Sequence, residues 1–591
     1  MSDDHAPADP SKAERSFVLD GIDESVTGDA VDHVLAGGDG EVPTKSAEDV
    51  RAEIMDDVVD HFATDYDPET LGIDRPEESA VRGRWFDFDY LGDYEVVTWR
   101  WSRRPYSYTA IVYDPTENEH RYHAVAPVLT EFEQYVRQDL TRTLRQDLMH
   151  RDLGAEEERD EVFELEAQRV FDEHAAAVPP AVLLRVLYYL RRDFVRYGKI
   201  DPLMGDPAIE DISCDGVGVP IFVYHGAYRD LETNLTFGAD RLDTFVTRLA
   251  QRAGKSLTAA DPLLDASLPD GSRAQFTLGS DVSLRGSTFT IRRFSEDPFT
   301  PPDLVEFGTF SLDQMAYLWL LVENGKSVMF AGGTGSGKTT SLNAISYFIP
   351  PGNKIVSIED TPELRLPHDN WVRNVTRESS TAEGQGAVTM FDLLESALRQ
   401  RPEFLLVGEI RANPQVAFTF FQAISTGHTA YTTFHADSAD GAMRRLENEP
   451  LNIPEQMAGS LDVISIQRQV TNGDNRVRRN HRLVELSPED DGTVTKRDVF
   501  GRDPATDSME QHNRSLLLQE VKYERGWDDD RLRRELSLRR EVLRYLLDND
   551  ISHHRDVGRV IHTFYRRPRA VLEQIRADDL DPTDLPSPRA D

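Results

Sequence analysis

Cysteine is almost absent from this chain, and its scarcity excludes two kinds of structure. Cys214 is the only cysteine among 591 residues. One thiol cannot form a disulfide framework, and it cannot supply the cysteine ligands of a structural zinc site. The apolar residues, 39% of the chain, are enough to bury real cores. The length predicts about three or four domains of ~150 residues each.

Long apolar runs and a basic N-terminus are missing as well. No run approaches the ~18 apolar residues that a membrane-spanning helix needs, and the first residues are acidic, unlike those of a signal peptide. The sequence therefore predicts a soluble, cytoplasmic protein without a transmembrane segment of its own. Any peripheral attachment to a membrane would then depend on partner proteins.

Lysine is rare, and carboxylates far outnumber the basic residues. Lys and Arg total 66 against 105 Asp and Glu, which gives a formal net charge of −39, and most of the basic residues are arginine. Excess carboxylates with little lysine are typical of proteins adapted to concentrated salt, where charge keeps the surface hydrated. The acidity argues only mildly against a nucleic-acid partner, because a global adaptation would hide a local basic patch.

One glycine-rich segment carries the strongest functional signal. Residues 328–340 read VMFAGGTGSGKTT and contain the pattern G-x-x-x-x-G-K-T. An apolar run (327–331) enters the segment and a helix-compatible run (340–348) leaves it, which is the strand, loop and helix context of a P-loop. An accidental Gly-rich turn would not require strand and helix to be placed in this way.

The chemistry of this segment fits a nucleoside triphosphate. Its glycines let backbone N–H groups curl around a phosphate chain at the start of a helix. Lys338 can neutralise the terminal phosphates, and the Thr339 hydroxyl can ligate Mg²⁺. The predicted binding residues are Gly332, Gly333, Thr334, Gly335, Ser336, Gly337, Lys338, Thr339 and Thr340.

Composition and periodicity divide the chain into segments of different character. They are a disordered acidic tail (1–50), an N-terminal α+β domain (51–153), a charged helical connector (154–179), a second α+β domain (180–294), a hinge linker (295–305), a domain that alternates strand and helix (306–510) and a helical C-terminal region (511–591). The alternation in 306–510 predicts a parallel sheet with ligands at the carboxyl ends of its strands.

An apolar strand of this domain ends in an acid. Residues 404–408 lead into Glu409, which can hold the water shell of Mg²⁺ or polarise the attacking water. The preceding position, where many P-loop proteins keep a metal-organising aspartate, is Gly408. The plainer interpretation is a buried strand with an acidic cap.

A second strand, 354–359, ends in clustered carboxylates. They are Glu359, Asp360 and Glu363. A general base for water must lie within one hydrogen bond of the in-line position. Glu359 and Glu363 are both candidates, and spacing does not separate them. Solvated acids of a turn are the alternative.

Two histidines, His428 and His435, bracket a threonine-rich strand. Zinc binding is disfavoured because no matching Cys or acidic ligand set lies near them in the sequence. The histidines could be satisfied structural groups, or they could sense the γ-phosphate. Both are therefore candidate nucleotide contacts.

Taken in order, these segments resemble the type II/type IV secretion-system ATPase superfamily. Residues 332–340 resemble its Walker A motif, 357–368 its Asp box, 398–411 its atypical Walker B motif, in which Gly-Glu is the family's own form, and 426–438 its His box. Segments 201–216 and 470–486 are similar to the archaeal branch, which includes the archaellum motor ATPase and the archaeal type IV pilus assembly ATPase. The salt-adapted composition fits a haloarchaeal member.

The resemblance implies an α/β fold: a RecA-like P-loop NTPase core with a parallel sheet, α+β domains before it and a helical unit after it. It also implies a hexamer that uses ATP and Mg²⁺ to drive assembly or rotation of a pilus-like filament through a membrane-embedded platform protein, without direct nucleic-acid contact. Arginines of the preceding domain would complete the site, and Arg273, Arg285 and Arg292 match. Surface arginines are the plainer interpretation.

Two other functions stay open. A DNA-translocating, conjugation-type ATPase on the same core would be stimulated by DNA, although the sequence has no basic groove interleaved with aromatics. A nucleotide-gated scaffold would bind ATP and hydrolyse it negligibly, and the carboxylates around the predicted site argue against it.

Overall fold

The computed structural model describes residues 46–68, 72–148, 156–174, 177–293, 298–377, 386–472, 475–489 and 491–586. They form two compact units that divide between Phe294 and Ser295. Most of the predicted acidic tail (1–50) lies outside the described residues, but Ala47 already begins helix α2 (Ala47–Asp60). Among the described residues, no helix combines the length and apolar character that crossing a bilayer requires.

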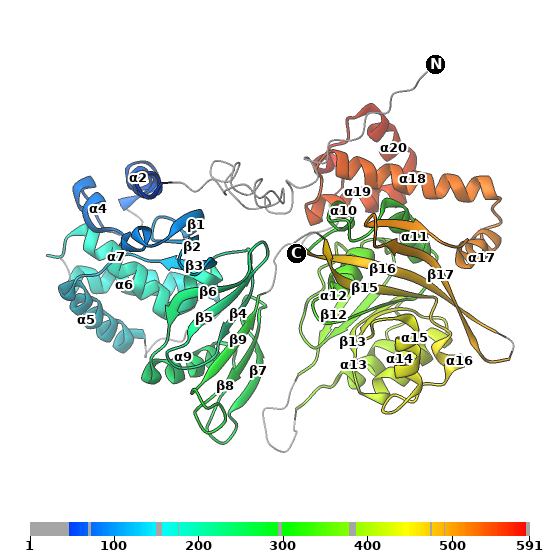
Figure 1. Ribbon diagram of the computed structural model, residues 1–591, viewed down its shortest axis with the longest axis horizontal. Coiled ribbons are helices and arrows are strands. Elements are labelled where there is room, and N and C mark those ends of the chain that lie inside the picture. Colours follow the sequence, from blue (N-terminus) through cyan, green and yellow to red (C-terminus); the bar gives the residue numbers. More distant parts are fainter. Residues whose placement is uncertain are drawn as a thin grey trace. The chain divides into compact units, whose positions relative to one another are not determined.

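The first unit is built on one nine-stranded sheet with the strand order β1-β2-β3-β6-β5-β4-β9-β8-β7 (Figure 1). The strands are β1 (Glu95–Arg103), β2 (Ser107–Asp114), β3 (Glu119–Val125), β4 (Ile209–Cys214), β5 (Pro220–His225), β6 (Arg229–Thr236), β7 (Leu263–Ser267), β8 (Arg273–Thr277) and β9 (Thr288–Arg292). The sequence separated 51–153 from 180–294, whereas parallel pairing of β3 with β6 joins strands of both ranges in one sheet.

Two apolar clusters cover the faces of this sheet. Successive side chains of β2 point to opposite faces: Tyr108, Ala110 and Val112 pack in one cluster, and Ile111 packs in the other. The helices of this unit are α2, α4 (Glu78–Arg84), α5 (Glu131–Leu148), α6 (Glu156–His174), α7 (Pro180–Phe194), α8 (Asp201–Met204) and α9 (Ala239–Arg252). The charged connector predicted at 154–179 contains α6, whose Phe163 and Val170 are buried.

The second unit has its own sheet, with the order β12-β11-β13-β14-β10-β15-β16-β17-β18. The strands are β10 (Val328–Gly332), β11 (Ile355–Glu359), β12 (Trp371–Val375), β13 (Phe404–Ile410), β14 (Thr429–Phe434), β15 (Val463–Asn472), β16 (Asn475–Pro488), β17 (Val494–Asp503) and β18 (Ser508–Gln511). Neighbours from β12 to β15 are parallel, which confirms the α/β class and the parallel sheet. From β15 to β18 the neighbours are antiparallel, an extension that strand and helix alternation did not predict.

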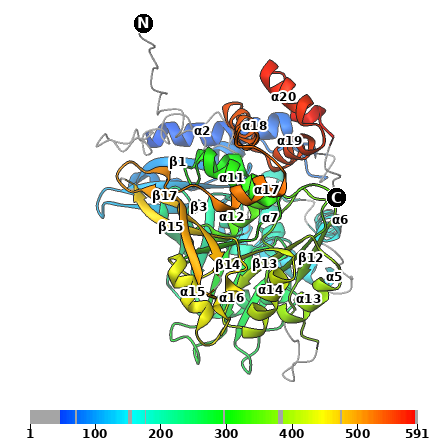
Figure 2. The same cartoon turned by 90° about the vertical axis from the view of Figure 1, so that its right-hand side faces the viewer.

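Helices cover both faces of this sheet (Figures 1 and 2). They are α10 (Pro301–Glu306), α11 (Leu312–Glu323), α12 (Lys338–Ser346), α13 (Met390–Leu398), α14 (Pro414–Ser425), α15 (Ala439–Glu447), α16 (Glu455–Ala458), α17 (Leu516–Glu524), α18 (Asp529–Asp548), α19 (His554–Arg566) and α20 (Pro568–Ala577). Strand β10 serves both layers, since Val328 and Phe330 pack with α11, α12 and the C-terminal helices, whereas Met329 and Ala331 pack with α13 to α16.

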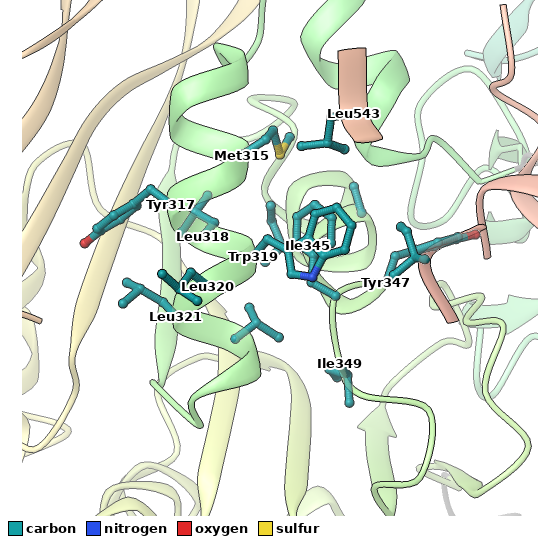
Figure 3. Close-up of a cluster of buried hydrophobic side chains, with 14 of the residues drawn as sticks. Met315, Tyr317, Leu318, Trp319, Leu320, Leu321, Ile345, Tyr347, Ile349 and Leu543 are labelled. Atoms are coloured by element: carbon teal, nitrogen blue, oxygen red, sulfur yellow. The ribbon is translucent and has the colours of Figure 1, made fainter. Parts of the chain in front are cut away.

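The C-terminal helices share a core with the sheet of the second unit (Figure 3). The Trp319 ring stacks on Phe348 with ring centroids 4.8 Å apart and meets Phe564 edge-on at 5.4 Å. The Tyr565 hydroxyl donates to the Phe348 carbonyl, just beyond α12, at 2.6 Å. Within the helical C-terminal region predicted at 511–591, α19 ends at Arg566 and α20 begins at Pro568, because Pro568 cannot continue a helix from the preceding turn.

The predicted hinge linker (295–305) is only partly described. Residues 294–297 lie outside the described residues. Thr300 and Asp303 form a capping box that starts α10 at Pro301. Leu304 is buried in the core of the second unit, so the second half of the predicted linker belongs to that packed unit.

Candidate functional site

The predicted P-loop, residues 333–337 and called the phosphate loop below, lies between β10 and α12, as the glycine pattern predicts. Gly335 and Gly337 have φ angles of 71° and 86°, a region that favours glycine. A Cβ atom on Gly332 would lie 2.4 Å from the Gln467 carbonyl oxygen. Backbone conformation therefore requires glycine at positions 335 and 337, and close packing requires it at position 332.

The Lys338 side chain lies against this loop. Its Nζ donates to the Gly333 carbonyl at 2.7 Å, and the Ser336 hydroxyl donates to the same carbonyl at 2.9 Å. Burial lowers the pKa of Lys338, while the charges of Glu409 and Glu363 act to raise it. The loop, its cation and two carboxylates are therefore gathered in one place.

Glu409 stands at the carboxyl end of β13, beside β14. Its Oε1 lies 2.7 Å from His435 Nε2, and its Oε2 accepts from Arg411 Nε at 3.0 Å. Burial lowers the pKa of His435, the nearby Lys338 ammonium lowers it further, and the Glu409 carboxylate acts to raise it. Glu409 and His435 therefore both lie near the phosphate loop, as expected for residues at the carboxyl ends of parallel strands.

The structure distinguishes the two candidate bases of the segment after β11. Glu359 is 3% exposed, and its Oε1 accepts from the backbone N–H groups of Glu363 and Leu364 at 2.8 and 3.0 Å. Burial raises the pKa of Glu359 to about 7, although these two amides act to lower it. Glu359 thus holds the turn that carries Glu363, and the half-buried Glu363 acts electrostatically on Lys338.

The raised pKa of Glu359 makes folding stability depend on pH. Because the folded-state pKa of about 7 exceeds the ordinary value of 4.5, the native state binds more protons between those values, and stability falls as pH rises through that window. In Glu359→Gln this titration is absent and an amide acceptor remains. Denaturant unfolding at pH 5 and pH 8 should show the wild type losing roughly 3 kcal/mol relative to the variant, at about 1.4 kcal/mol per pKa unit. A difference that does not change with pH would contradict this assignment.

The two predicted histidines lie at opposite ends of β14. His435 follows the strand, but His428 precedes it and its Nδ1 lies 3.3 Å from the Ala423 carbonyl at the end of α14. The next residue, Thr429, donates to the Gly325 carbonyl before β10. Since six strand residues span roughly 20 Å, the structure does not bring His428 to the phosphate loop. The prediction that both histidines contact the nucleotide is therefore corrected, because only His435 lies near the loop.

The three predicted arginines lie in the first unit. Arg273 on β8 and Arg292 on β9 are directly opposite each other in the sheet. Arg292 Nε donates to Asp211 Oδ1 at 3.0 Å, and Arg285 is exposed in the turn before β9. Their part in a nucleotide site stays a prediction.

Three further contacts were not predicted from the sequence. Arg411 pairs with Glu409 and lies 3.6 Å from Asp360, and its position two residues beyond the candidate acid is a signal that could have identified it. Gln469 and Arg478 contact the loop at the Gly335 carbonyl. No local pattern marks them, because they come from the antiparallel extension.

The oxygen donors fit a magnesium ion that arrives with phosphates. In the described part of the chain, no cluster of His, Cys, Asp and Glu could hold a metal ion alone. Thr339 in the first turn of α12 and Glu409 supply hard oxygen atoms beside the loop. Mg²⁺ commonly takes one or two protein oxygens and completes its shell with phosphates and water.

Comparison with known proteins gives consistent matches along the chain. A family model described as type II/IV secretion system protein matches residues 230–526. Models described as PilB3-like, N-terminal and PilB3-like, C-terminal match residues 74–128 and 505–586.

Individual relatives come from archaea and bacteria. An uncharacterized protein of Methanocaldococcus jannaschii is 38% identical over 410 residues, which cover 68% of this chain and 73% of that protein. The type IV secretion system protein PtlH of Bordetella pertussis is 36% identical over 232 residues, covering 35% of this chain and 67% of that protein. The crystal structure of the VirB11 ATPase from the Brucella suis type IV secretion system is 26% identical, covers 48% of this chain and 92% of that chain, and has a TM-score of 0.26.

Proposed function

We propose that this chain, which belongs to the type II/IV secretion system protein family, is an Mg²⁺-dependent ATPase that works as a motor for a pilus-like filament or a secretion system. The observation that carries the proposal is the convergence of Lys338, Glu409 and His435 at the phosphate loop. Parallel α/β sheets bind their ligands at this edge.

The proposed roles follow from the positions of these side chains. The loop amides and Lys338 hold the triphosphate, and Thr339 offers a hydroxyl to the metal. Mg²⁺ bound with the triphosphate would neutralise charge on its oxygens. Glu409, held between Arg411 and His435, orders the attacking water or the water shell of the metal. His435 is placed to respond to the terminal phosphate.

The choice of general base follows from the turn after β11. The two backbone N–H groups that donate to Glu359 fix this turn. Glu363 is therefore the proposed general base, and Glu359 is the residue that positions it. Asn343 on α12 accepts from the Arg365 backbone N–H at 2.8 Å and ties the turn to the phosphate-binding helix.

The wider assignment rests on family membership and composition. We propose a homohexameric ring, cytoplasmic and attached peripherally to the membrane through a filament platform protein. The PilB3-like matches at both ends and the archaeal relative support the archaeal branch, with an archaellum or an archaeal pilus as the filament. The net charge of −39 supports a haloarchaeal setting. We also propose that Arg273, Arg285 and Arg292 complete the site as cations that are supplied when subunits assemble.

A turnover assay in molar KCl tests this proposal. The full-length chain is expected to hydrolyse ATP with Mg²⁺, to stop when EDTA removes the metal, and to respond to archaeal-lipid vesicles but not to DNA. Stimulation by DNA would instead favour a translocase, and binding of Mg·ATP with negligible turnover would favour a nucleotide-gated scaffold. Absence of Mg·ATP binding by the folded protein would overturn the assignment altogether.

A further inference from the structure

The antiparallel hairpin of β15 and β16 contacts the phosphate loop. Gln469 and Arg478 are opposite each other across the two strands. Gln469 Nε2 donates to the Gly335 carbonyl at 3.3 Å, and Arg478 Nε donates to the same oxygen at 3.0 Å. A Cβ atom on Gly337 would lie 3.5 Å from Arg478 Cδ, so the hairpin packs directly against the loop.

The residues that follow Arg478 fix which way it points. Arg479 is 8% exposed and faces the other side of the strand, where its Nη2 and Nε donate to Asp507 Oδ2 at 2.9 and 3.0 Å. Its Nη1 also donates to the Phe307 carbonyl at 2.7 Å. Asn480 is fully buried and donates to Ser465 on β15 at 2.9 Å. Because side chains alternate along a strand, these anchors direct Arg478 toward the loop.

A bond to the Gly335 carbonyl also orients the next amide. In a trans peptide unit the C=O and the following N–H point in opposite directions. Two donors that hold the Gly335 oxygen toward the hairpin therefore direct the Ser336 N–H away from the hairpin. Neutralising the carbonyl also lowers its repulsion of a phosphate oxygen.

We propose that Arg478 and Gln469 are positioning residues that hold the phosphate loop in its anion-binding conformation before a nucleotide arrives. The hairpin acts through the Gly335 carbonyl and shapes the loop amides for the triphosphate. This inference rests on the proposed function for the identity of the ligand, but its structural part concerns the loop alone.

Matched substitutions on one strand test the role. Arg478→Ala is expected to weaken Mg·ATP binding about tenfold, since hydrogen bonds from charged donors are among the stronger ones. Arg478→Lys should recover part of the affinity, because an ammonium can still donate to one carbonyl. Arg476→Ala is the control: it removes the same charge two residues away, at an exposed position. Equal losses in Arg476→Ala and Arg478→Ala would mean general electrostatic attraction and would overturn the proposal.

A second readout does not depend on nucleotide. Millisecond hydrogen exchange of the amides of residues 333–337 should quicken in Arg478→Ala and in Gln469→Ala but not in Arg476→Ala, and unchanged exchange would overturn the proposal. If Arg478→Ala fails to fold, Arg478→Lys and Gln469→Ala decide the outcome in both assays. If the wild type binds no Mg·ATP, the proposed function fails, whereas the exchange experiment still decides whether the hairpin orders the loop.

Discussion

Replacement of Glu409 by Gln is expected to reduce the rate of ATP hydrolysis by a factor of ~10² to 10⁴ and to leave Mg·ATP binding close to that of the wild type. Glutamine keeps the size of the side chain and can still accept from Arg411 Nε, which donates to Glu409 at 3.0 Å. It has no negative charge with which to order the attacking water or the water shell of the metal, or to attract His435 Nε2, 2.7 Å away. Turnover should therefore fall while the ground-state complex persists.

Single-turnover kinetics and equilibrium binding of labelled Mg·ATP separate these two quantities. Glu395→Gln is a matched control, since Glu395 on α13 is half-exposed and pairs only loosely with Arg399 at 3.7 Å. It should hydrolyse ATP at the wild-type rate. Brisk hydrolysis by Glu409→Gln would remove Glu409 from the reaction and leave Glu363 as the carboxylate to examine.

The local part of this site could be predicted from the sequence because its signals are local. The glycines, Lys338 and Thr339 lie within one short segment, and the flanking strand and helix form as predicted. The rule that ligands meet the carboxyl ends of parallel strands identified Glu409 correctly as a residue beside the loop. Applied to β14, the same rule selects His435 and rejects His428, because only His435 follows the strand.

Contacts between distant segments could not be predicted in this way. Arg478 and Gly335 are 143 positions apart, and Arg478 lies among several arginines of similar appearance. Only the register of β15 with β16, fixed by the buried Arg479 and Asn480, selects Arg478 for the loop. Single-sequence patterns carry no information on that register.

The division of the first unit shows the same limit. A charged segment separates 51–153 from 180–294 in the sequence, and charge there suggested a connector between domains. One face of its helix α6 nevertheless packs into the core with Phe163 and Val170. The parallel pairing of β3 with β6 closes the sheet across this segment. Average composition concealed both the buried face and the long-range pairing.

Replacement of Lys338 by Ala is expected to weaken Mg·ATP binding by roughly a hundredfold or more, since the variant loses the ammonium that we propose neutralises the phosphates. The Lys338 ammonium lies 2.7 Å from the Gly333 carbonyl, beside the amides that would surround the triphosphate. Burial already lowers its pKa, which means that folding works against this charge and that its removal should leave thermal stability unchanged or raised.

Lys354→Ala is the matched control for this experiment. Lys354 precedes β11, at the amino ends of the parallel strands, and its Nζ donates to the Gln400 carbonyl at 3.0 Å. Titration of labelled Mg·ATP in molar KCl should show wild-type affinity for Lys354→Ala and a large loss for Lys338→Ala. High salt makes the comparison strict, because it screens the long-range attraction of any lysine and leaves direct contacts largely intact. Equal affinities for the two variants would place the phosphates somewhere other than this loop, and the roles assigned to Glu409 and Arg478 would then lose their basis.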